Sequence, residues 1–303
     1  MSHLETVNVV CTIDNNYIQH CAVMLTSLLK NNYQLKFKIF IIKDNLDHQL
    51  EIKLINFLDN CNQDYSLITV DDSIFLSAPI SKHISLATYY RLLIPQLVDS
   101  KVEKILFLDS DIVIRKSITP LWNIDISNYS HAAVKNPGVS FERKQNLKMP
   151  EDSAYFNAGV LLINLRVWRE LAVTQRAIEF IEQYPEKIDF HDQDVLNHVL
   201  CNQWFSIESQ WNAQYAFFFK DFSLEDFGGT LEAYQQAKYD PAIIHFTGSG
   251  SCKPWHYNCN HPFKEDYYKY LNQTPWRGFK YISRPSLVSR LKAKTKGIIQ
   301  KIK

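Results

Sequence analysis

The sequence predicts an α/β protein whose mostly parallel sheet is doubly wound, with helices on both faces. Strand-like apolar runs alternate with helix-like segments over the first 70 residues. Residues 158–165 are almost wholly apolar, as in an inner strand that is covered on both sides. No linker rich in Pro, Gly or Ser interrupts residues 1–266, which favours a single domain. Such a sheet places its ligand crevice at the carboxyl ends of the strands.

The first elements follow from apolar runs and capping residues. Residues 7–13 suit a buried strand, and Asp14, Asn15 and Asn16 offer N-cap side chains for a helix to about residue 29. A strand at 37–42, an amphipathic helix at 46–58 and a strand at 65–70 complete a βαβαβ unit. The elements expected beyond it are a helix at 85–93, strands at 104–108 and 158–165, helices at 167–183 and 191–200, an irregular aromatic stretch at 204–222, and a strand at 242–246.

Charge divides the chain into an acidic body and a basic tail. Residues 1–266 carry 23 basic and 32 acidic residues, whereas residues 267–303 carry ten basic residues and no acidic one. We therefore expect a domain at 1–266 and a basic C-terminal tail at 267–303. From Arg284 onward, seven basic residues alternate with Leu and Ile, which favours peripheral binding to an anionic membrane surface. A solvated terminus is the alternative.

We expect a cytoplasmic protein that lies at the inner face of the cell membrane and does not bind nucleic acid. No signal peptide and no stretch of about 20 apolar residues is recognisable. The six cysteines are scattered without a CxxC pair, which is typical of free thiols in a reducing compartment.

Two carboxylates follow the apolar strand expected at 104–108. Asp109 and Asp111 are separated by Ser110, so both can face the crevice at the strand's end. Hard cations such as Mg²⁺ and Mn²⁺ prefer oxygen ligands and bridge carboxylates to phosphate oxygens. A capped turn with two solvated acids is the alternative explanation for such a pair.

A second polar segment supports a metal and phosphate site. His245 ends the strand expected at 242–246, and small residues, among them Gly248, separate it from Lys253. Small residues let backbone N–H groups approach a phosphate, the lysine supplies positive charge, and the imidazole can be a third metal ligand. Together the two segments indicate a bound metal and phosphate.

Six segments in order, from residue 7 to about residue 262, resemble glycosyltransferase family 8. Within that family the chain resembles bacterial enzymes that add α-linked galactose or glucose to lipopolysaccharide. The matching segments are TIDNNY at 12–17, HISLATYYR at 83–91, FLDSD at 107–111 with PLW at 120–122, FNAG at 156–159, HDQD at 191–194, and HFTGSG at 245–250 with KPWH at 253–256.

The resemblance implies a GT-A fold and a retaining transfer of galactose or glucose from a UDP-sugar to a glycan or glycolipid acceptor. It implies Mn²⁺, with Mg²⁺ as a possible substitute, at Asp109, Asp111 and His245. Gln193 and Asp192 would be the catalytic residues, and Gln193 is a poor nucleophile, which favours an ion-pair route. The positions implied to bind the nucleotide sugar are Thr12, Asp14, Asn16 and Tyr17 at uracil and ribose, Arg91, Asn157 and Ala158 at the sugar, Gly248 and Lys253 at the diphosphate, and also His83 and Ser110.

Several residues also have structural explanations. Asp14 could be a helix cap, Tyr17 a packing residue, and Asp192 with Asp194 a first-turn acid cluster favoured by the helix dipole. Residues 135–155 depart from the family pattern, with Asn136 where related galactosyltransferases tend to place an acid, so the acceptor stays open.

Two other functions remain to be weighed. Asp109 and Asp111 also fit the strand-end motif of haloacid-dehalogenase-type phosphohydrolases, in which Asp109 would attack phosphorus. That motif usually follows the first strand of a chain, whereas three expected strands precede it here. A non-catalytic glycan-binding protein is the third possibility, because 16 Tyr and 6 Trp could stack on sugars.

Overall fold

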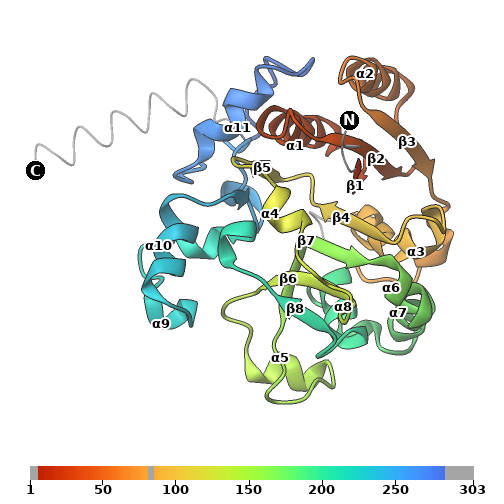
Figure 1. The fold of residues 1–303 in the computed structure, drawn as a ribbon, viewed down its shortest axis with the longest axis vertical. Coiled ribbons are helices and arrows are strands. Elements are labelled where there is room, and N and C mark those ends of the chain that lie inside the picture. The colour runs from red at the N-terminus through yellow and green to blue at the C-terminus, as the bar shows by residue number, and fades with distance from the viewer. Residues whose placement is uncertain (1–5, 81–84, 284–303) are drawn as a thin grey trace, which may run out of the picture.

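A seven-stranded sheet forms the centre of the computed structural model, which describes residues 6–80 and 85–283 (Figure 1). The first four strands in the sheet order are parallel, as are the last two, while β7 runs antiparallel to both of its neighbours. The predicted α/β class with a mostly parallel sheet is confirmed. In sheet order the strands are β3 (Asp64–Thr69), β2 (Lys36–Lys43), β1 (Thr6–Ile13), β4 (Lys104–Leu108), β7 (Phe156–Asn164), β6 (His131–Lys135) and β8 (Trp204–Ser206).

A small second sheet positions the functional site. Its strands are β5 (Ile112–Ile114), β10 (Ile243–His245) and β9 (Ala213–Gln214), with β10 in the middle. β10 pairs antiparallel to β5, which places His245 opposite Ile112, and parallel to β9. The second sheet therefore brings the end of β10 beside the loop that joins β4 to β5.

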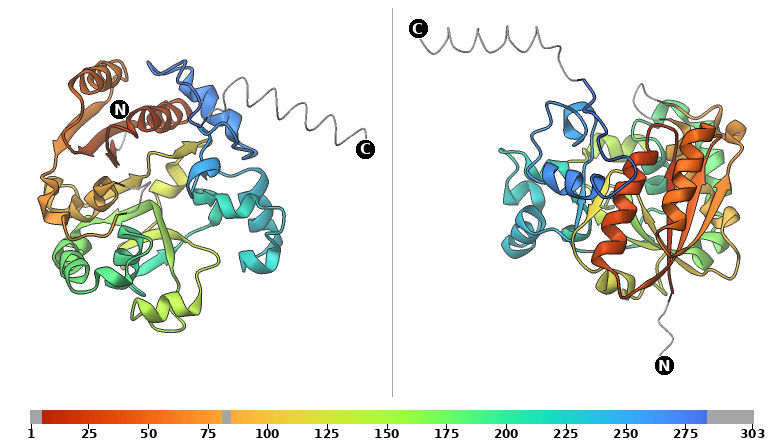
Figure 2. Two further views of the ribbon diagram at one scale, coloured as in Figure 1. Left: turned by 180° about the vertical axis from the view of Figure 1, so that it is seen from behind. Right: turned by 90° about the horizontal axis from the view of Figure 1, so that it is seen from above.

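Helices cover both faces of the main sheet (Figure 2). Alternate residues of β1 point to opposite faces, so that Val9 and Cys11 join one core and Val10 joins the other. The first core lies under α1 (Ile18–Asn31), α2 (His48–Asp59) and α11 (Lys264–Leu271). The second lies under η2 (Leu86–Leu93, a 3-10 helix), α3 (Ile94–Leu97), α6 (Leu165–Glu170), α7 (Val173–Gln183) and α8 (Asp192–Val199).

Short helices fill the connections between these elements. The α-helices are α4 (Thr119–Trp122), α5 (Phe141–Asn146), α9 (Leu224–Phe227) and α10 (Leu231–Tyr239). The 3-10 helices are η1 (Asp72–Phe75), η3 (Pro185–Lys187), η4 (Ser209–Asn212), η5 (Tyr215–Phe218) and η6 (Gly250–Cys252).

Two predicted helices differ from the observed ones. The segment 167–183 is divided between α6 and α7, because Ala172 takes a left-handed conformation with φ of 49°. Neither Gly nor Pro marks that break in the sequence. The segment 85–93 is a 3-10 helix, and α3 follows it with Pro95 in its first turn, where a missing N–H costs no hydrogen bond.

The predicted boundary at residue 266 is too early. Tyr267, Tyr270, Leu271 and Trp276 are all buried in the core beneath α1 and α2. The packed body therefore continues to at least Trp276, although the charge pattern changes ten residues earlier. Residues 284–303, which carry the predicted membrane-binding segment, lie outside the described residues. Within residues 6–80 and 85–283, no helix has both the length and the hydropathy needed to span a membrane.

Candidate functional site

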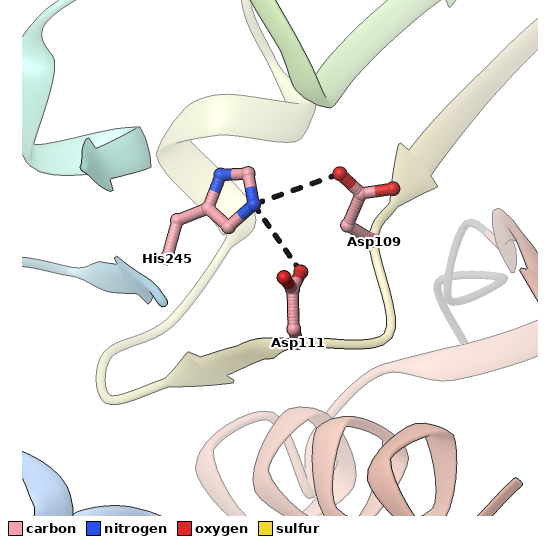
Figure 3. Close-up of side chains that lie close together, drawn as sticks. All are labelled: Asp109, Asp111 and His245. Carbon is pink, nitrogen blue, oxygen red and sulfur yellow. Dashed lines mark ion pairs between the residues drawn. The ribbon is translucent and has the colours of Figure 1, made fainter. Parts of the chain in front are cut away.

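Asp109, Asp111 and His245 meet at the carboxyl end of β4 (Figure 3). The Nε2 atom of His245 lies 3.2 Å from Asp111 Oδ1 and 3.6 Å from Asp109 Oδ2. One ligand atom from each residue lies within 4.8 Å of the others, and no second group of this kind occurs among the described residues. Two carboxylates and one imidazole are a donor set that suits a divalent cation. The two acids form an Asp-x-Asp (DxD) pair. The predicted site of this pair with His245 is therefore present as a cluster.

Gly159 has no side chain, and the space beside it is occupied by the side chains of His245 and Asp109. The backbone N–H of Asp109 donates to the Gly159 carbonyl at 2.8 Å, so β7 passes directly beside the cluster. A Cβ atom on Gly159 would lie 2.1 Å from His245 Cε1 and 2.7 Å from Asp109 Oδ2. A side chain at this position would displace both prospective ligands.

Arg91 supplies the positive charge beside Asp109. Its buried guanidinium contacts Asp109 Oδ1 at 2.7 Å, Asp192 Oδ2 at 2.8 Å and the Ala158 carbonyl at 2.6 Å. Burial opposes its charge, but the two carboxylates outweigh burial and raise the pKa of Arg91. The residue predicted to meet the sugar thus joins two carboxylates, a role that the sequence does not reveal.

Lys253 supplies the positive charge beside Asp111. Its Nζ atom pairs with Asp111 Oδ2 and donates to the Phe246 carbonyl at 2.8 Å. Burial raises the pKa of Asp111, but the charge of Lys253 and the contact with His245 outweigh burial and hold that pKa well below its usual range. The lysine predicted to lie near a diphosphate is therefore at the DxD-like site.

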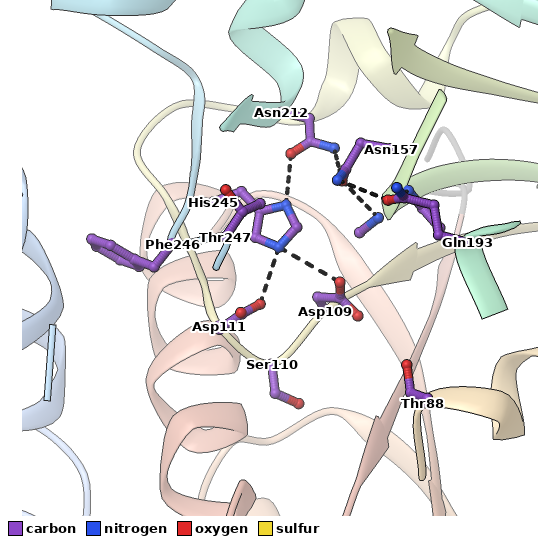
Figure 4. Close-up of polar contacts among 12 residues, drawn as sticks. Thr88, Asp109, Ser110, Asp111, Asn157, Gln193, Asn212, His245, Phe246 and Thr247 are labelled. Carbon is purple, nitrogen blue, oxygen red and sulfur yellow. Dashed lines mark hydrogen bonds and ion pairs between the residues drawn. The ribbon is translucent and has the colours of Figure 1, made fainter. Parts of the chain in front are cut away.

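Gln193 is held by the start of β7 (Figure 4). Its Oε1 atom accepts from Asn157 Nδ2 at 3.0 Å and from the Ala158 N–H at 3.1 Å, and its Nε2 atom donates to the Tyr155 hydroxyl at 3.2 Å. The structure thus brings together Gln193, Asn157 and Ala158, three residues that the sequence assigned to one region.

Asp192 is buried beside the same strand end. It accepts a hydrogen bond from the Thr88 hydroxyl and pairs with Arg91. Burial raises the pKa of Asp192 to about 6, and the Arg91 charge limits that rise. Thr88 has no role in the sequence prediction, although it lies in one of the matching segments.

Asn212 is the other residue that the sequence missed. It is fully buried and joins Asn157 to His245, with distances of 2.8 Å and 2.9 Å (Figure 4). A single Asn in an irregular aromatic stretch carries no sequence signal of its own.

The predicted nucleoside-binding residues lie around the end of β1. Asp14 Oδ1 accepts from the backbone N–H groups of Asn16 and Tyr17, and Oδ2 accepts from Ser85 Oγ at 2.6 Å. Asp14 therefore closes the turn that precedes α1, whose N-cap residue is Tyr17, and the expected helix cap by Asp14 is not observed. Tyr17 packs edge-on against Trp255, with ring centroids 5.9 Å apart.

Three further predicted positions remain, of which the structure describes Ser110 and Gly248. Ser110 Oγ donates to the Thr12 carbonyl at 3.1 Å, which ties the loop after β4 to β1. Gly248 follows β10 with φ of 87°, a conformation that favours glycine. His83 lies outside the described residues.

Comparison with known proteins identifies the class of this enzyme. Residues 8–259 match the profile of glycosyl transferase family 8. The chain therefore belongs to glycosyltransferase family 8, and it is a glycosyltransferase. Both alternatives, the phosphohydrolase and the non-catalytic glycan-binding protein, are disfavoured by this assignment.

Individual relatives match over most of their length. The chain is 32% identical to general stress protein A of Bacillus subtilis (strain 168), covering 90% of this chain and 95% of that protein. It is 30% identical to a lipopolysaccharide 1,2-glucosyltransferase of Escherichia coli, covering 91% and 81%. The crystal structure of the galactosyltransferase LgtC with donor and acceptor sugar analogs aligns with a TM-score of 0.80 and 26% identity, covering 90% of this chain and 99% of that one. The predicted GT-A fold is confirmed.

We predict that Gly159→Ala weakens binding of Mn²⁺ by about 10-fold or more, because the added methyl displaces His245 and Asp109. Isothermal titration with Mn²⁺ measures the affinity, and circular dichroism checks the fold. Gly138→Ala is the control for a methyl added away from the cluster, because a Cβ at Gly138 meets nothing within 4 Å; its φ of 75° makes the substitution strained, so Mn²⁺ affinity and not stability is compared. Equal Mn²⁺ affinity in wild type and Gly159→Ala would show that the cluster does not bind the ion.

Proposed function

We propose that this chain is a retaining hexosyltransferase that moves galactose or glucose from a UDP-sugar to lipopolysaccharide, lipooligosaccharide or another surface glycan. The observation that supports this most is the meeting of Asp109, Asp111 and His245 in a family 8 fold, with Gln193 connected to them through Asn157 and Asn212. The acceptor class comes from the names of relatives such as the glucosyltransferase of Escherichia coli.

The proposed cofactor is Mn²⁺, with Mg²⁺ as a substitute, held by Asp109, Asp111 and His245. The residues fit such an ion, since two carboxylates and an imidazole suit a divalent cation and Gly159 leaves room for the side chains of His245 and Asp109. A divalent cation bound there would neutralise the negative charge that develops on the diphosphate leaving group. Lys253 would add positive charge on the same side, because its ammonium already lies on Asp111.

The proposed role of Gln193 is to stabilise the positive charge on the sugar. The two carboxylates that flank it are buried and paired with arginine, Asp192 with Arg91 and Asp194 with Arg143. Their charges are thus already engaged, which supports an ion-pair route over a covalent intermediate. Asp192 would hold a sugar hydroxyl, while Thr12, Asn16, Tyr17 and Ser110 would surround the nucleoside.

We predict that EDTA abolishes turnover of UDP-galactose or UDP-glucose and that added Mn²⁺ restores it. Asp111→Asn should also abolish turnover, because it removes a charged ligand from the metal. Slow hydrolysis of each donor measures activity without requiring the acceptor. Asp152→Asn, a change at an exposed acid, should leave the rate unchanged. Full activity in EDTA would contradict metal dependence even if Asp111→Asn proves unstable.

We predict that Gln193→Ala lowers kcat by about 10²-fold and leaves the affinity for UDP unchanged, because this side chain acts on the developing sugar charge. Donor hydrolysis gives kcat and KM, and isothermal titration gives the UDP affinity. Gln183→Ala, at an exposed position of α7, is the control. A rise in KM with kcat unaltered would instead indicate ordinary ground-state binding.

The basic tail is proposed to hold the enzyme at the inner face of the cell membrane. Each Lys or Arg near an anionic leaflet contributes about 1 kcal/mol, so seven such residues suffice for reversible binding. We predict that the protein sediments with vesicles containing anionic lipid, that salt releases it, and that deletion of residues 284–303 abolishes binding but spares donor hydrolysis. Vesicles of neutral lipid are the control. Equal sedimentation of the truncated protein would rule out the tail as the anchor.

A further inference from the structure

Asn212 lies between two parts of the site that come from different sheets. It is the last residue of η4 and directly precedes β9, which pairs with β10. Its side chain is fully buried and reaches Asn157, at the start of β7, and His245, at the end of β10. It thus connects the main sheet to the second sheet beside the DxD-like cluster.

The side-chain amides of Gln193, Asn157 and Asn212 are hydrogen-bonded in series. Two backbone N–H groups of β7 fix which end of each amide is the oxygen and which is the nitrogen. The Gly159 N–H donates to Asn157 Oδ1 at 3.0 Å, and the Ala158 N–H donates to Gln193 Oε1 at 3.1 Å. A backbone N–H can only donate, so the atoms facing these groups are oxygens. The amide of Asn157 therefore has one allowed orientation, with its nitrogen directed at Gln193 Oε1.

The same reasoning extends to His245. Asn157 Oδ1 lies 2.8 Å from the amide of Asn212, so Asn212 must present its nitrogen there and its oxygen to His245 Nδ1 at 2.9 Å. An amide oxygen only accepts, so the proton must be on Nδ1. Nε2, the nitrogen that faces Asp109 and Asp111, is therefore the one whose lone pair is left for a cation bound between them.

We propose that Asn212 is a positioning residue that holds His245 as the Nδ1–H tautomer and so directs its Nε2 lone pair at a divalent cation. The role toward the cation rests on the proposed metal-dependent function. The role toward the tautomer does not, because the hydrogen-bond chain that imposes it contains no metal. A hydrogen-bond acceptor behind a ligating histidine both orients the ring and increases the basicity of the ligand.

Three variants separate this role from general packing. Asn212→Leu removes the acceptor for His245 Nδ1–H and keeps most of the volume. Asn212→Asp keeps an acceptor for His245 but sets a carboxylate oxygen against Asn157 Oδ1. Gln214→Leu is the control, since Gln214 is a buried amide of the same segment that is paired with His245 in the second sheet, while its side chain donates to the Lys135 carbonyl at 3.0 Å.

The test is nitrogen-15 NMR of the metal-free protein labelled at histidine, recorded over the pH range in which the protein stays folded, with His245→Ala to assign the resonances. Wild type, Asn212→Asp and Gln214→Leu should show a protonated Nδ1. Asn212→Leu should show an unprotonated Nδ1, with the proton on Nε2, which faces Asp109 and Asp111. An unchanged His245 spectrum in Asn212→Leu would overturn the proposal.

Mn²⁺ titration of the same proteins is the second measurement. Asn212→Leu should bind Mn²⁺ about 10- to 100-fold more weakly than wild type, whereas Asn212→Asp and Gln214→Leu should stay close to wild type. Wild-type affinity in Asn212→Leu would contradict the role toward the cation. If wild type itself binds no Mn²⁺, the proposed function fails, and the NMR comparison still decides the tautomer.

Discussion

The site depends on placing three carboxylates together, Asp111 and Asp192 buried and Asp109 half-buried, without leaving their charges unpaired. Asp109, Asp111 and Asp192 converge there, and a buried carboxylate without a counter-charge would be strongly destabilising. Two buried cations, Arg91 and Lys253, meet this requirement, one on each side of the cluster. They come from segments 162 residues apart, so the site cannot be balanced until both halves of the chain have packed.

The second constraint is that β7 lies close to the end of β4, where Asp109 begins the loop. Because β7 is antiparallel to β4, its first residues are the ones that lie there. The same residues hold Gln193 through Asn157 and Ala158, while Gly159 leaves space for His245. One strand therefore arranges both the prospective metal ligands and the proposed catalytic amide, and Asn212 joins the two groups.

The sequence predicts the meeting of Asp109, Asp111 and His245 because each of these residues lies at or just after the end of a recognisable strand. Asp109 and Asp111 follow an apolar run, and His245 ends another, so the topology of an α/β sheet brings them to one edge. The positions of Gln193 and Asn157 came instead from the family resemblance, since neither residue type signals this chemistry alone. The requirement for glycine at 159 was not predictable, because it arises from packing against His245, 86 residues away.

Local sequence signals also misplaced some boundaries. Ala172 breaks a helix without Gly or Pro, because tertiary packing overrides the helix preference of its neighbours. The change of charge at residue 266 is not a packing boundary, since Tyr267 and Trp276 are core residues of the same body. Charge patterns describe the surface of a chain, whereas the extent of a domain is set by which apolar side chains are buried.

The most direct test of this account is a crystal structure of the protein with Mn²⁺ and UDP, with anomalous scattering used to locate the metal. The account predicts one strong anomalous peak within coordination distance of Asp109, Asp111 and His245 Nε2, with the diphosphate of UDP on the same ion. A peak elsewhere, or UDP bound in the crevice with no metal beside these three residues, would contradict it.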